Sequence, residues 1–255
     1  MADQVLAFDS FGDGPMPVIV LHGWFGDQTS FAPMVDALSP EEFTYILPSY
    51  RGYGGSLNMR GAYTVEEISR DVLDLADSLE IETFALIGHS MGGMAVQRVL
   101  ADAPERVEKI VAVAPVPASG AGLDDATYTM FERAVSEEEV ACGIVDLSTG
   151  GRLSKEWVRN IATYPKTAAL DEAFSGYLAS WAKTDFHTEI KGNPVPMLVA
   201  VGEFDGAINE AAMRATYMQW YPNAELVVVG NAGHYPMNET PVAFATLMEA
   251  FLRRE

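Results

Sequence analysis

The chain has 255 residues, of which 49% are hydrophobic and 20% are charged, a composition typical of a globular protein with a large core. Acidic residues outnumber basic ones by 36 to 16, and the formal net charge is -20 at pH 7. Nucleic acids and anionic membrane surfaces bind basic patches, so this charge argues against both as partners. The single cysteine, Cys142, excludes an intramolecular disulfide and a cysteine-based metal site.

Two features of the sequence bear on where the protein resides. Residues 1–4 lack the basic segment that precedes the long apolar stretch of a signal peptide. No apolar run approaches the roughly 18 to 20 residues that a membrane-spanning helix requires. We therefore expect a cytoplasmic protein, while the sequence does not indicate its oligomeric state.

Short apolar runs recur along the chain. Residues 4–9 predict a short edge strand, and turn-forming residues follow at 12–15. Six runs rich in Val, Ile, Leu, Ala and Phe then predict strands at residues 18–21, 43–47, 84–87, 110–114, 197–201 and 226–229. Four of these runs are continuously apolar, as expected of strands that are covered on both faces.

Helical patterns separate the apolar runs. Residues 65–79 carry apolar side chains close to the 3.6-residue period, and Thr64 with Glu67 forms a capping-box pattern at their start. Residues 91–100 and 242–252 predict further helices. This alternation predicts an α/β fold, with a mostly parallel, doubly wound sheet and helices on both of its faces.

The alternation stops between residues 115 and 194, where no strand-like run occurs. Helical patterns in this segment cover residues 124–134, 137–145, 155–163 and 168–181. We interpret residues 115–194 as a helical cap inserted into a core domain made of residues 1–114 and 195–255. Some of the aromatic side chains of the cap should wall a substrate pocket, and the candidates are Tyr128, Phe131, Trp181 and Phe186.

A glycine-rich turn joins the run at 84–87 to the helix at 91–100. Its sequence, Gly88-His89-Ser90-Met91-Gly92-Gly93, places a serine at the apex of a sharp strand-to-helix turn. The hydroxyl of this serine should project over the end of the sheet, next to the N-terminus of a helix. The glycines stand where side chains would crowd a strained backbone. Ser90 is therefore the candidate nucleophile.

A serine nucleophile needs a base, and histidine has a pKa near neutrality. The chain has four histidines. His22 ends a predicted strand, His89 is the direct neighbour of Ser90, and His187 lies in the cap. His234 follows the last predicted strand, and loops at the carboxyl ends of parallel strands gather at one edge of a sheet. Because Ser90 lies at the same edge, His234 is the candidate base.

The base in turn needs a carboxylate that orients it and stabilises the imidazolium. Asp205 follows the strand at 197–201 and should emerge at the same edge as His234. Glu203 is the nearby alternative, and Asp185 is a more remote one.

The negative charge of a tetrahedral intermediate requires two backbone N–H donors. Met91, directly after the nucleophile and at a helix N-terminus, is the first candidate donor. The second is Trp24, in the glycine-containing loop 22–26. In this interpretation His22 braces the loop and takes no part in catalysis.

These motifs together resemble the α/β-hydrolase fold superfamily, and the resemblance runs nearly from end to end. The nucleophile, acid and histidine occur in the chain order of that family. The resemblance is carried by His22-Gly23-Trp24, residues 50–56, Gly88 to Gly93, Gly202-Glu203-Phe204-Asp205 and Gly233-His234. Trp181 with Thr184-Asp185-Phe186 also resembles the branch of small bacterial esterases and cofactor-free haloperoxidases. Few residues precede the strand at 18–21, which implies that the first strand pair of the family is curtailed.

We expect a serine hydrolase of the carboxylesterase type that cleaves a small organic ester through an acyl-enzyme, without a cofactor or a metal ion. The serine excludes the dehalogenases and epoxide hydrolases of this fold, which use an aspartate nucleophile. Lactones, thioesters, aryl esters and the carbon–carbon bonds of diketones stay open as substrates. The rival interpretations are a small-molecule receptor of the same fold with little turnover and a metal-dependent hydrolase.

Overall fold

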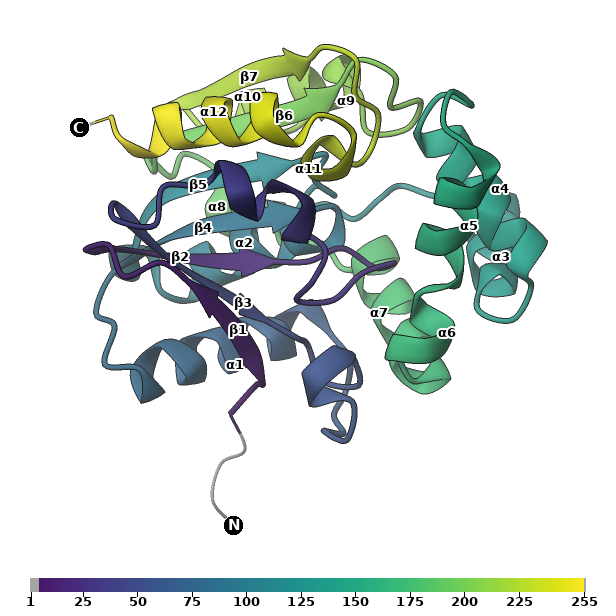
Figure 1. Ribbon diagram of the computed structural model, residues 1–255, viewed down its shortest axis with the longest axis horizontal. Coiled ribbons are helices and arrows are strands. Elements are labelled where there is room, and N and C mark those ends of the chain that lie inside the picture. The colour runs from purple at the N-terminus through teal and green to yellow at the C-terminus, as the bar shows by residue number, and fades with distance from the viewer. Residues whose placement is uncertain (1–4, 255) are drawn as a thin grey trace.

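A seven-stranded sheet forms the centre of the computed structural model, which describes residues 5–254 (Figure 1). The strand order is β1-β3-β2-β4-β5-β6-β7, and only β1 runs antiparallel to its neighbour. The mostly parallel sheet predicted from the alternation of strands and helices is confirmed. The strands are β1 Phe8–Phe11, β2 Met16–Leu21, β3 Phe43–Pro48, β4 Phe84–His89, β5 Val107–Val113, β6 Met197–Gly202 and β7 Ala224–Val229.

The centre of the sheet is covered on both faces, as the continuous apolar runs predict. Every residue of β4 and of β6 is buried, whereas β7, at the edge of the sheet, is largely half-buried or exposed. Helices α1 (Val65–Ser78) and α2 (Met91–Asp102) pack together on one face. The 3-10 helix η1 (Ala32–Ala37) and helix α12 (Pro241–Leu252) pack together on the other (Figure 1).

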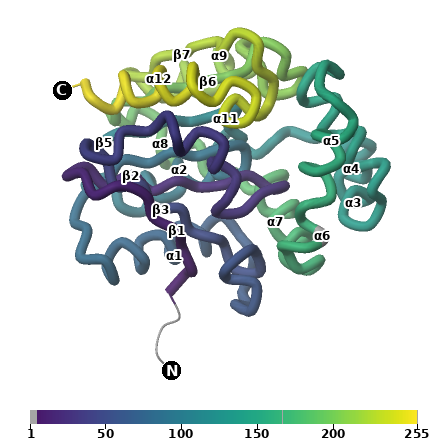
Figure 2. The backbone as a smooth tube through the Cα atoms, viewed as in Figure 1, coloured from purple at the N-terminus to yellow at the C-terminus, as the bar shows by residue number. Residues whose placement is uncertain are grey.

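The helical insertion lies between β5 and β6 and gathers at one end of the sheet, to the right in Figure 2. Helices α3 to α6 form the inserted region, and α7 packs between it and α1. The division at residues 115–194 stays a prediction. The helices are α3 Asp125–Ala134, α4 Glu138–Ser148, α5 Lys155–Thr163, α6 Pro165–Ala168, α7 Asp171–Lys183 and α8 His187–Ile190. Three short helices follow β6 and β7: α9 Glu210–Ala215, α10 Tyr217–Trp220 and α11 Pro236–Glu239.

Two local expectations differ from the structure. The edge strand expected at residues 4–9 occupies Phe8–Phe11 and pairs with β3, while residue 4 lies outside the described residues. Thr64 caps α1 as predicted, because its hydroxyl accepts a hydrogen bond from the N–H of Glu67. The Glu67 carboxylate accepts its bond from the N–H of Tyr63 at 2.8 Å, where the capping-box pattern predicts Thr64 as the donor. Tyr63 has a left-handed φ of 56°, so the chain turns one residue before the cap.

The turn between β4 and α2 is a crowded backbone junction at the sheet edge. A Cβ atom added to Gly92 would lie 2.3 Å from the carbonyl oxygen of Leu21, and one added to Gly93 would lie 2.2 Å from Cβ of Pro115. Neither obstacle is the end of a flexible side chain. These two glycines therefore let α2 approach the sheet closely, which is what the turn motif predicts.

The crowding at Gly92 makes a prediction for stability. Gly92→Ala should lower the free energy of unfolding by about 1–3 kcal/mol, because backbone has to move to accept the new methyl group. Gly143→Ala on α4 is the matched control, since a Cβ there meets nothing within 4 Å. The control should gain about 0.5–1 kcal/mol from the better helix propensity of alanine. Urea unfolding of both variants measures the difference, and equal effects would contradict the close approach.

Candidate active site

Three strand ends bring the candidate catalytic residues to one edge of the sheet. Ser90 follows β4, Asp205 follows β6 and His234 follows β7. These strands run parallel, so their carboxyl ends lie at the same edge. The insertion faces this edge in Figure 1. A site at this edge therefore lies between the strand-end loops and the inserted helices.

Ser90 occupies a strained backbone conformation at the apex of its turn. Its φ and ψ are 54° and -115°, outside the regions that residues with a side chain normally adopt. The turn is fixed by a bond from the N–H of Ser90 to the carbonyl of Val113 and by two bonds that the Ser90 carbonyl accepts, from Gly93 and Val116, all at 2.9 Å. The residue is half-buried, and its hydroxyl forms no hydrogen bond within residues 5–254. The hydroxyl is thus free to react.

Asp205 and His234 are joined by a short hydrogen bond. Nδ1 of His234 lies 2.6 Å from Oδ2 of Asp205, whose side chain is fully buried. The other carboxyl oxygen, Oδ1, accepts bonds from the N–H groups of Ala207 and Ile208, both at 3.0 Å. These contacts fix the carboxyl group, which in turn fixes the orientation of the imidazole. Nδ1 of the ring faces the acid, and Nε2 is left for another partner.

The two alternative acids are held elsewhere. Glu203 accepts a bond from the N–H of Asn231 at 2.9 Å and is exposed. Asp185 lies 2.6 Å from Nδ1 of His187 on the surface of the insertion. Of the three carboxylates weighed from the sequence, Asp205 is the one that contacts His234.

His89, the neighbour of Ser90, supports the histidine loop from below. Its Nε2 lies 2.9 Å from the carbonyl oxygen of His234, and the two rings are 4.9 Å apart. Burial lowers the pKa of His89 well below its usual range, and the neighbouring His234 adds to the effect. His89 is therefore neutral at physiological pH and donates its Nε2–H to the carbonyl.

The two candidate oxyanion donors are backbone groups at the same edge. Met91 is the first residue of α2, where an N–H group has no acceptor within the helix. Trp24 follows β2; its carbonyl accepts from Tyr53 at 3.1 Å, and its indole Nε1 donates to the carbonyl of Phe174 at 2.8 Å. The N–H of Trp24 has no hydrogen-bond partner in the described part of the chain. Both N–H groups are available to a ligand.

Comparison with known proteins bears directly on this arrangement. A sequence model described as the alpha/beta hydrolase family matches residues 18–247. The chain belongs to the alpha/beta hydrolase family. Its homologues include esterases and a protein named as a putative non-heme chloroperoxidase.

Individual relatives of this alpha/beta hydrolase are similar along most of the chain. A pimeloyl-[acyl-carrier protein] methyl ester esterase of Klebsiella pneumoniae is 27% identical over 253 residues, which cover 93% of each chain. A thermophilic esterase from Thermogutta terrifontis is 25% identical, with a TM-score of 0.84 and coverage of 97% of this chain and 93% of the other. A bromoperoxidase from Bacillus anthracis shares the fold, with 22% identity, a TM-score of 0.84 and coverage of 97% and 95%.

Aromatic side chains of the insertion pack against Trp24. The ring of Phe174 stacks on that of Trp24, with 3.8 Å between the ring centroids. The rings of Trp181 and Phe131 also lie against Trp24, at centroid distances of 5.8 and 5.7 Å. The candidates Trp181 and Phe131 therefore lie beside Trp24, the candidate oxyanion donor. Phe174 was not among the four candidates, because a helical pattern does not show which face of α7 meets the core.

The other two pocket candidates contact charged side chains. The ring of Tyr128 lies under Nζ of Lys183 at 3.8 Å, and that of Phe186 lies beside the guanidinium of Arg98 at 4.8 Å. These contacts give no support for a place beside Trp24. Tyr128 and Phe186 stay predictions as pocket residues.

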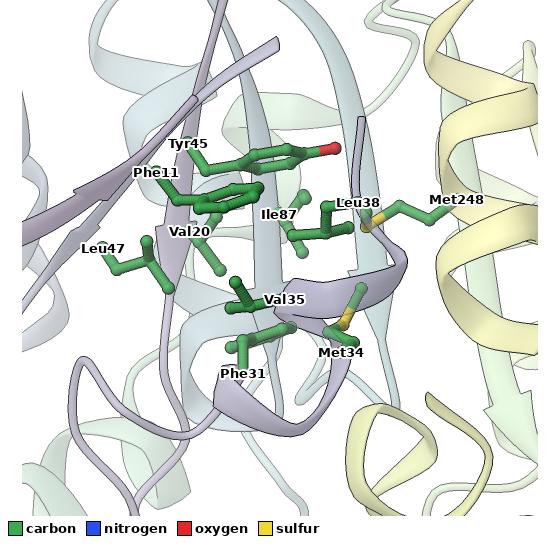
Figure 3. A pocket seen from close by; sticks show the side chains of 10 residues that line it. All are labelled: Phe11, Val20, Phe31, Met34, Val35, Leu38, Tyr45, Leu47, Ile87 and Met248. Atoms are coloured by element: carbon green, nitrogen blue, oxygen red, sulfur yellow. The ribbon is translucent and has the colours of Figure 1, made fainter. Parts of the chain in front are cut away.

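An apolar pocket elsewhere in the molecule carries no chemistry. It lies between η1, the sheet and α12, and Figure 3 shows its lining. The one polar atom among its lining side chains is the hydroxyl of Tyr45, which donates to Glu249 at 2.8 Å. Within residues 5–254, no three His, Cys, Asp or Glu side chains are grouped to hold a metal ion, and no helix has the length and apolar character to span a bilayer.

His22 is buried beside the candidate oxyanion donor Trp24 and is held by hydrogen bonds to backbone groups. Its Nε2 accepts from the N–H of Tyr50 at 3.4 Å, so its Nδ1 carries the proton and donates to the carbonyl of Gly23 at 2.9 Å. Burial lowers the pKa of His22 to about 4, although the Gly23 carbonyl and Asp27 act in the opposite direction. The neutral ring is the form that the fold accommodates.

This lowered pKa predicts a loss of stability in mild acid. The unfolded chain binds a proton at His22 below about pH 6.5, whereas the folded chain does so only near pH 4. The contribution of His22 is therefore complete above pH 6.5 and falls by roughly 3 kcal/mol as the pH approaches 4. In urea unfolding between pH 7.5 and 4.5, His22→Asn should show a shallower pH dependence than wild type. Parallel curves for the two proteins would contradict the prediction.

Proposed function

We propose that this alpha/beta hydrolase is a serine hydrolase that cleaves the carboxylic ester of a small organic substrate through an acyl-enzyme. The observation that carries the proposal is the 2.6 Å contact between Asp205 and His234, at the sheet edge where Ser90 occupies its strained turn. A serine at the same sheet edge as a histidine–carboxylate pair can act as a nucleophile, with the histidine as its base and the carboxylate as the group that orients the base. Such an arrangement suits acyl transfer.

In the proposed reaction, Oγ of Ser90 attacks the ester carbonyl while Nε2 of His234 takes the hydroxyl proton. Asp205 holds the imidazole and stabilises its positive charge. The N–H groups of Trp24 and Met91 donate to the oxyanion of the tetrahedral intermediate. His234 then gives the proton to the leaving alcohol, whose departure leaves the acyl group on Ser90. A water molecule, activated by His234, attacks this ester and releases the acid.

The surroundings of Trp24 support a largely apolar acyl or alcohol group. Phe131, Phe174 and Trp181 present aromatic surface beside the proposed oxyanion donor. The net charge of -20 disfavours the approach of polyanionic substrates. The Klebsiella relative is named as a methyl ester esterase, which supports an ester as the cleaved group. We retain a cytoplasmic location and activity without a cofactor as parts of the proposal.

Covalent labelling tests the nucleophile. A fluorophosphonate probe should label wild type and Ser136→Ala, whose serine is exposed and lies outside the site, but should not label Ser90→Ala. Wild type and Ser136→Ala should also hydrolyse p-nitrophenyl acetate, whereas Ser90→Ala should not. Asp205→Asn should lower kcat by about 10³- to 10⁴-fold, because the imidazole loses its orienting carboxylate. A wild-type protein that is neither labelled nor active would overturn the hydrolase and favour a receptor.

A substrate panel tests the class of bond. Acyl p-nitrophenyl esters of increasing chain length, aliphatic lactones and a diketone should be compared at equal enzyme concentration. Because the aromatic surface is apolar, we expect kcat/KM to rise with the first few methylenes, by about threefold each. Open esters should be cleaved faster than lactones or the diketone, and a chelator should leave the rates unchanged. Preferred cleavage of lactones or of the carbon–carbon bond would reassign the substrate within the same fold.

A further inference from the structure

Glu239 holds the backbone on both sides of the candidate base. Its Oε2 accepts from the N–H of Gly233 at 2.8 Å, and its Oε1 accepts from the N–H of Tyr235 at 3.0 Å. These residues are the direct neighbours of His234 in the chain. The glutamate side chain is 1% exposed, so both bonds are shielded from water. One carboxylate therefore fixes the segment from which the imidazole projects.

Arg152, from the turn between α4 and α5, completes this arrangement from the insertion. Its Nη2 lies 2.5 Å from Oε2 of Glu239 and also donates to the carbonyl of Asn231 at 3.0 Å. Its guanidinium lies over the ring of Phe204, 4.5 Å from the centroid. Phe204 precedes Asp205, so this one side chain touches the loops of both the candidate base and its candidate acid.

The pair is poorly explained as a device for stability alone. A buried ion pair recovers its desolvation cost only when all of its polar atoms are bonded. Nε of Arg152 is buried and has no hydrogen-bond partner within the described residues. Arg152 thus holds its position over Phe204 and Glu239 with one donor unsatisfied. At this position Arg152 fixes the conformation of the loop that carries His234.

Further contacts make the same loop rigid. The N–H of His234 itself donates to the carbonyl of Ser148, the last residue of α4, at 3.0 Å. Ala232 accepts from the N–H of Phe204 at 2.9 Å, and His89 holds the carbonyl of His234. Two of these supports come from the core. Arg152 and Ser148 come from the insertion, so the insertion is part of what positions the imidazole.

We propose that Arg152 and Glu239 are positioning residues that hold Nε2 of His234 in the geometry for proton transfer with Ser90. The inference rests on the proposed function and adds to it that the insertion supports the acid–base step as well as the pocket. A displacement of the imidazole by a fraction of an ångström slows proton transfer without removing any contact to the substrate. The pair should therefore act on kcat and leave KM nearly unchanged.

The chain contains a matched control for this pair. Glu249 of α12 is also buried, with 4% of its side chain exposed, and it pairs with Arg253 at 2.9 Å. It accepts from the N–H of Ser39 at 2.7 Å, as Glu239 does from its own loop. The Glu249 pair ties α12 to Ser39, just after η1, and contacts none of the residues 231–235. Loss of this pair should affect stability alone.

The test compares Glu239→Gln, Arg152→Ala and Arg152→Lys with Glu249→Gln and Arg253→Ala. Each protein is assayed for kcat and KM with p-nitrophenyl acetate, for the rate of fluorophosphonate labelling and for its thermal midpoint. Glu239→Gln and Arg152→Ala should lower kcat and the labelling rate by about 10- to 100-fold, with KM within about twofold of wild type. The Glu249 and Arg253 variants should lower the thermal midpoint and keep kcat within about twofold.

Rescue separates positioning from a structural role. Arg152 is 20% exposed, so added guanidinium can reach the space left in Arg152→Ala and should restore part of kcat. Arg152→Lys should retain part of kcat through its charge, although it cannot reproduce both bonds of the guanidinium. If Glu239→Gln does not fold, the Arg152 variants decide the question.

Wild-type kcat in folded Arg152→Ala, or an equal loss of kcat in the Glu249 pair, would overturn the positioning role. In either case a labelled and active wild type would leave the proposed function intact. A wild type that is neither labelled nor active would instead overturn the proposed function, and the positioning role with it.

Discussion

The close backbone contact between α2 and β2 sets the geometry on which the candidate site depends. At Gly92 the helix lies so near the carbonyl of Leu21 that a methyl group has no room. The helix can therefore begin directly beyond the end of β4, and the chain must turn sharply to enter it. Ser90 takes the strained conformation that this turn requires. Helix packing, rather than any contact of the serine side chain, raises Ser90 above the sheet edge.

The candidate base is held in a different way, by side chains and carbonyls from several parts of the chain. Ser90 owes its position to one local motif, whereas the loop of His234 receives bonds from His89, Glu239 and the end of α4. A strand-end loop with so many buried partners has little freedom to rearrange. Ser90 and His234, the partners in the proposed proton transfer, are thus positioned in different ways. Backbone strain positions Ser90, and a hydrogen-bond network positions His234.

The turn that holds Ser90 can be predicted from the sequence, whereas the contacts that hold His234 can be predicted only in outline. Ser90 is identifiable because its turn is encoded within a few adjacent residues. Asp205 and Glu203 both follow β6, so position in the chain alone does not separate them. In the structure Asp205 contacts His234, whereas Glu203 accepts from the N–H of Asn231. Phe174 and Glu239 escaped prediction for a common reason. Phe174 contacts Trp24 and Glu239 pairs with Arg152 across long stretches of chain. Local sequence patterns do not reveal such distant neighbours.

The helices between β5 and β6 are fastened to the core at several separated points, and this limits how a ligand can enter. Two of these points lie beside the candidate site. The indole of Trp24 is bonded to α7, and the turn after α4 is bonded to the loop of His234. Movement at either point would disturb the residues around Ser90. Helix α3 contributes no hydrogen bond to either attachment, and Ala134 is the one buried residue among Asp125–Ala134. Elements with few buried contacts open at the lowest free-energy cost. We therefore expect α3 to open more easily than the helices beside it, and a ligand to reach the candidate site by passing α3.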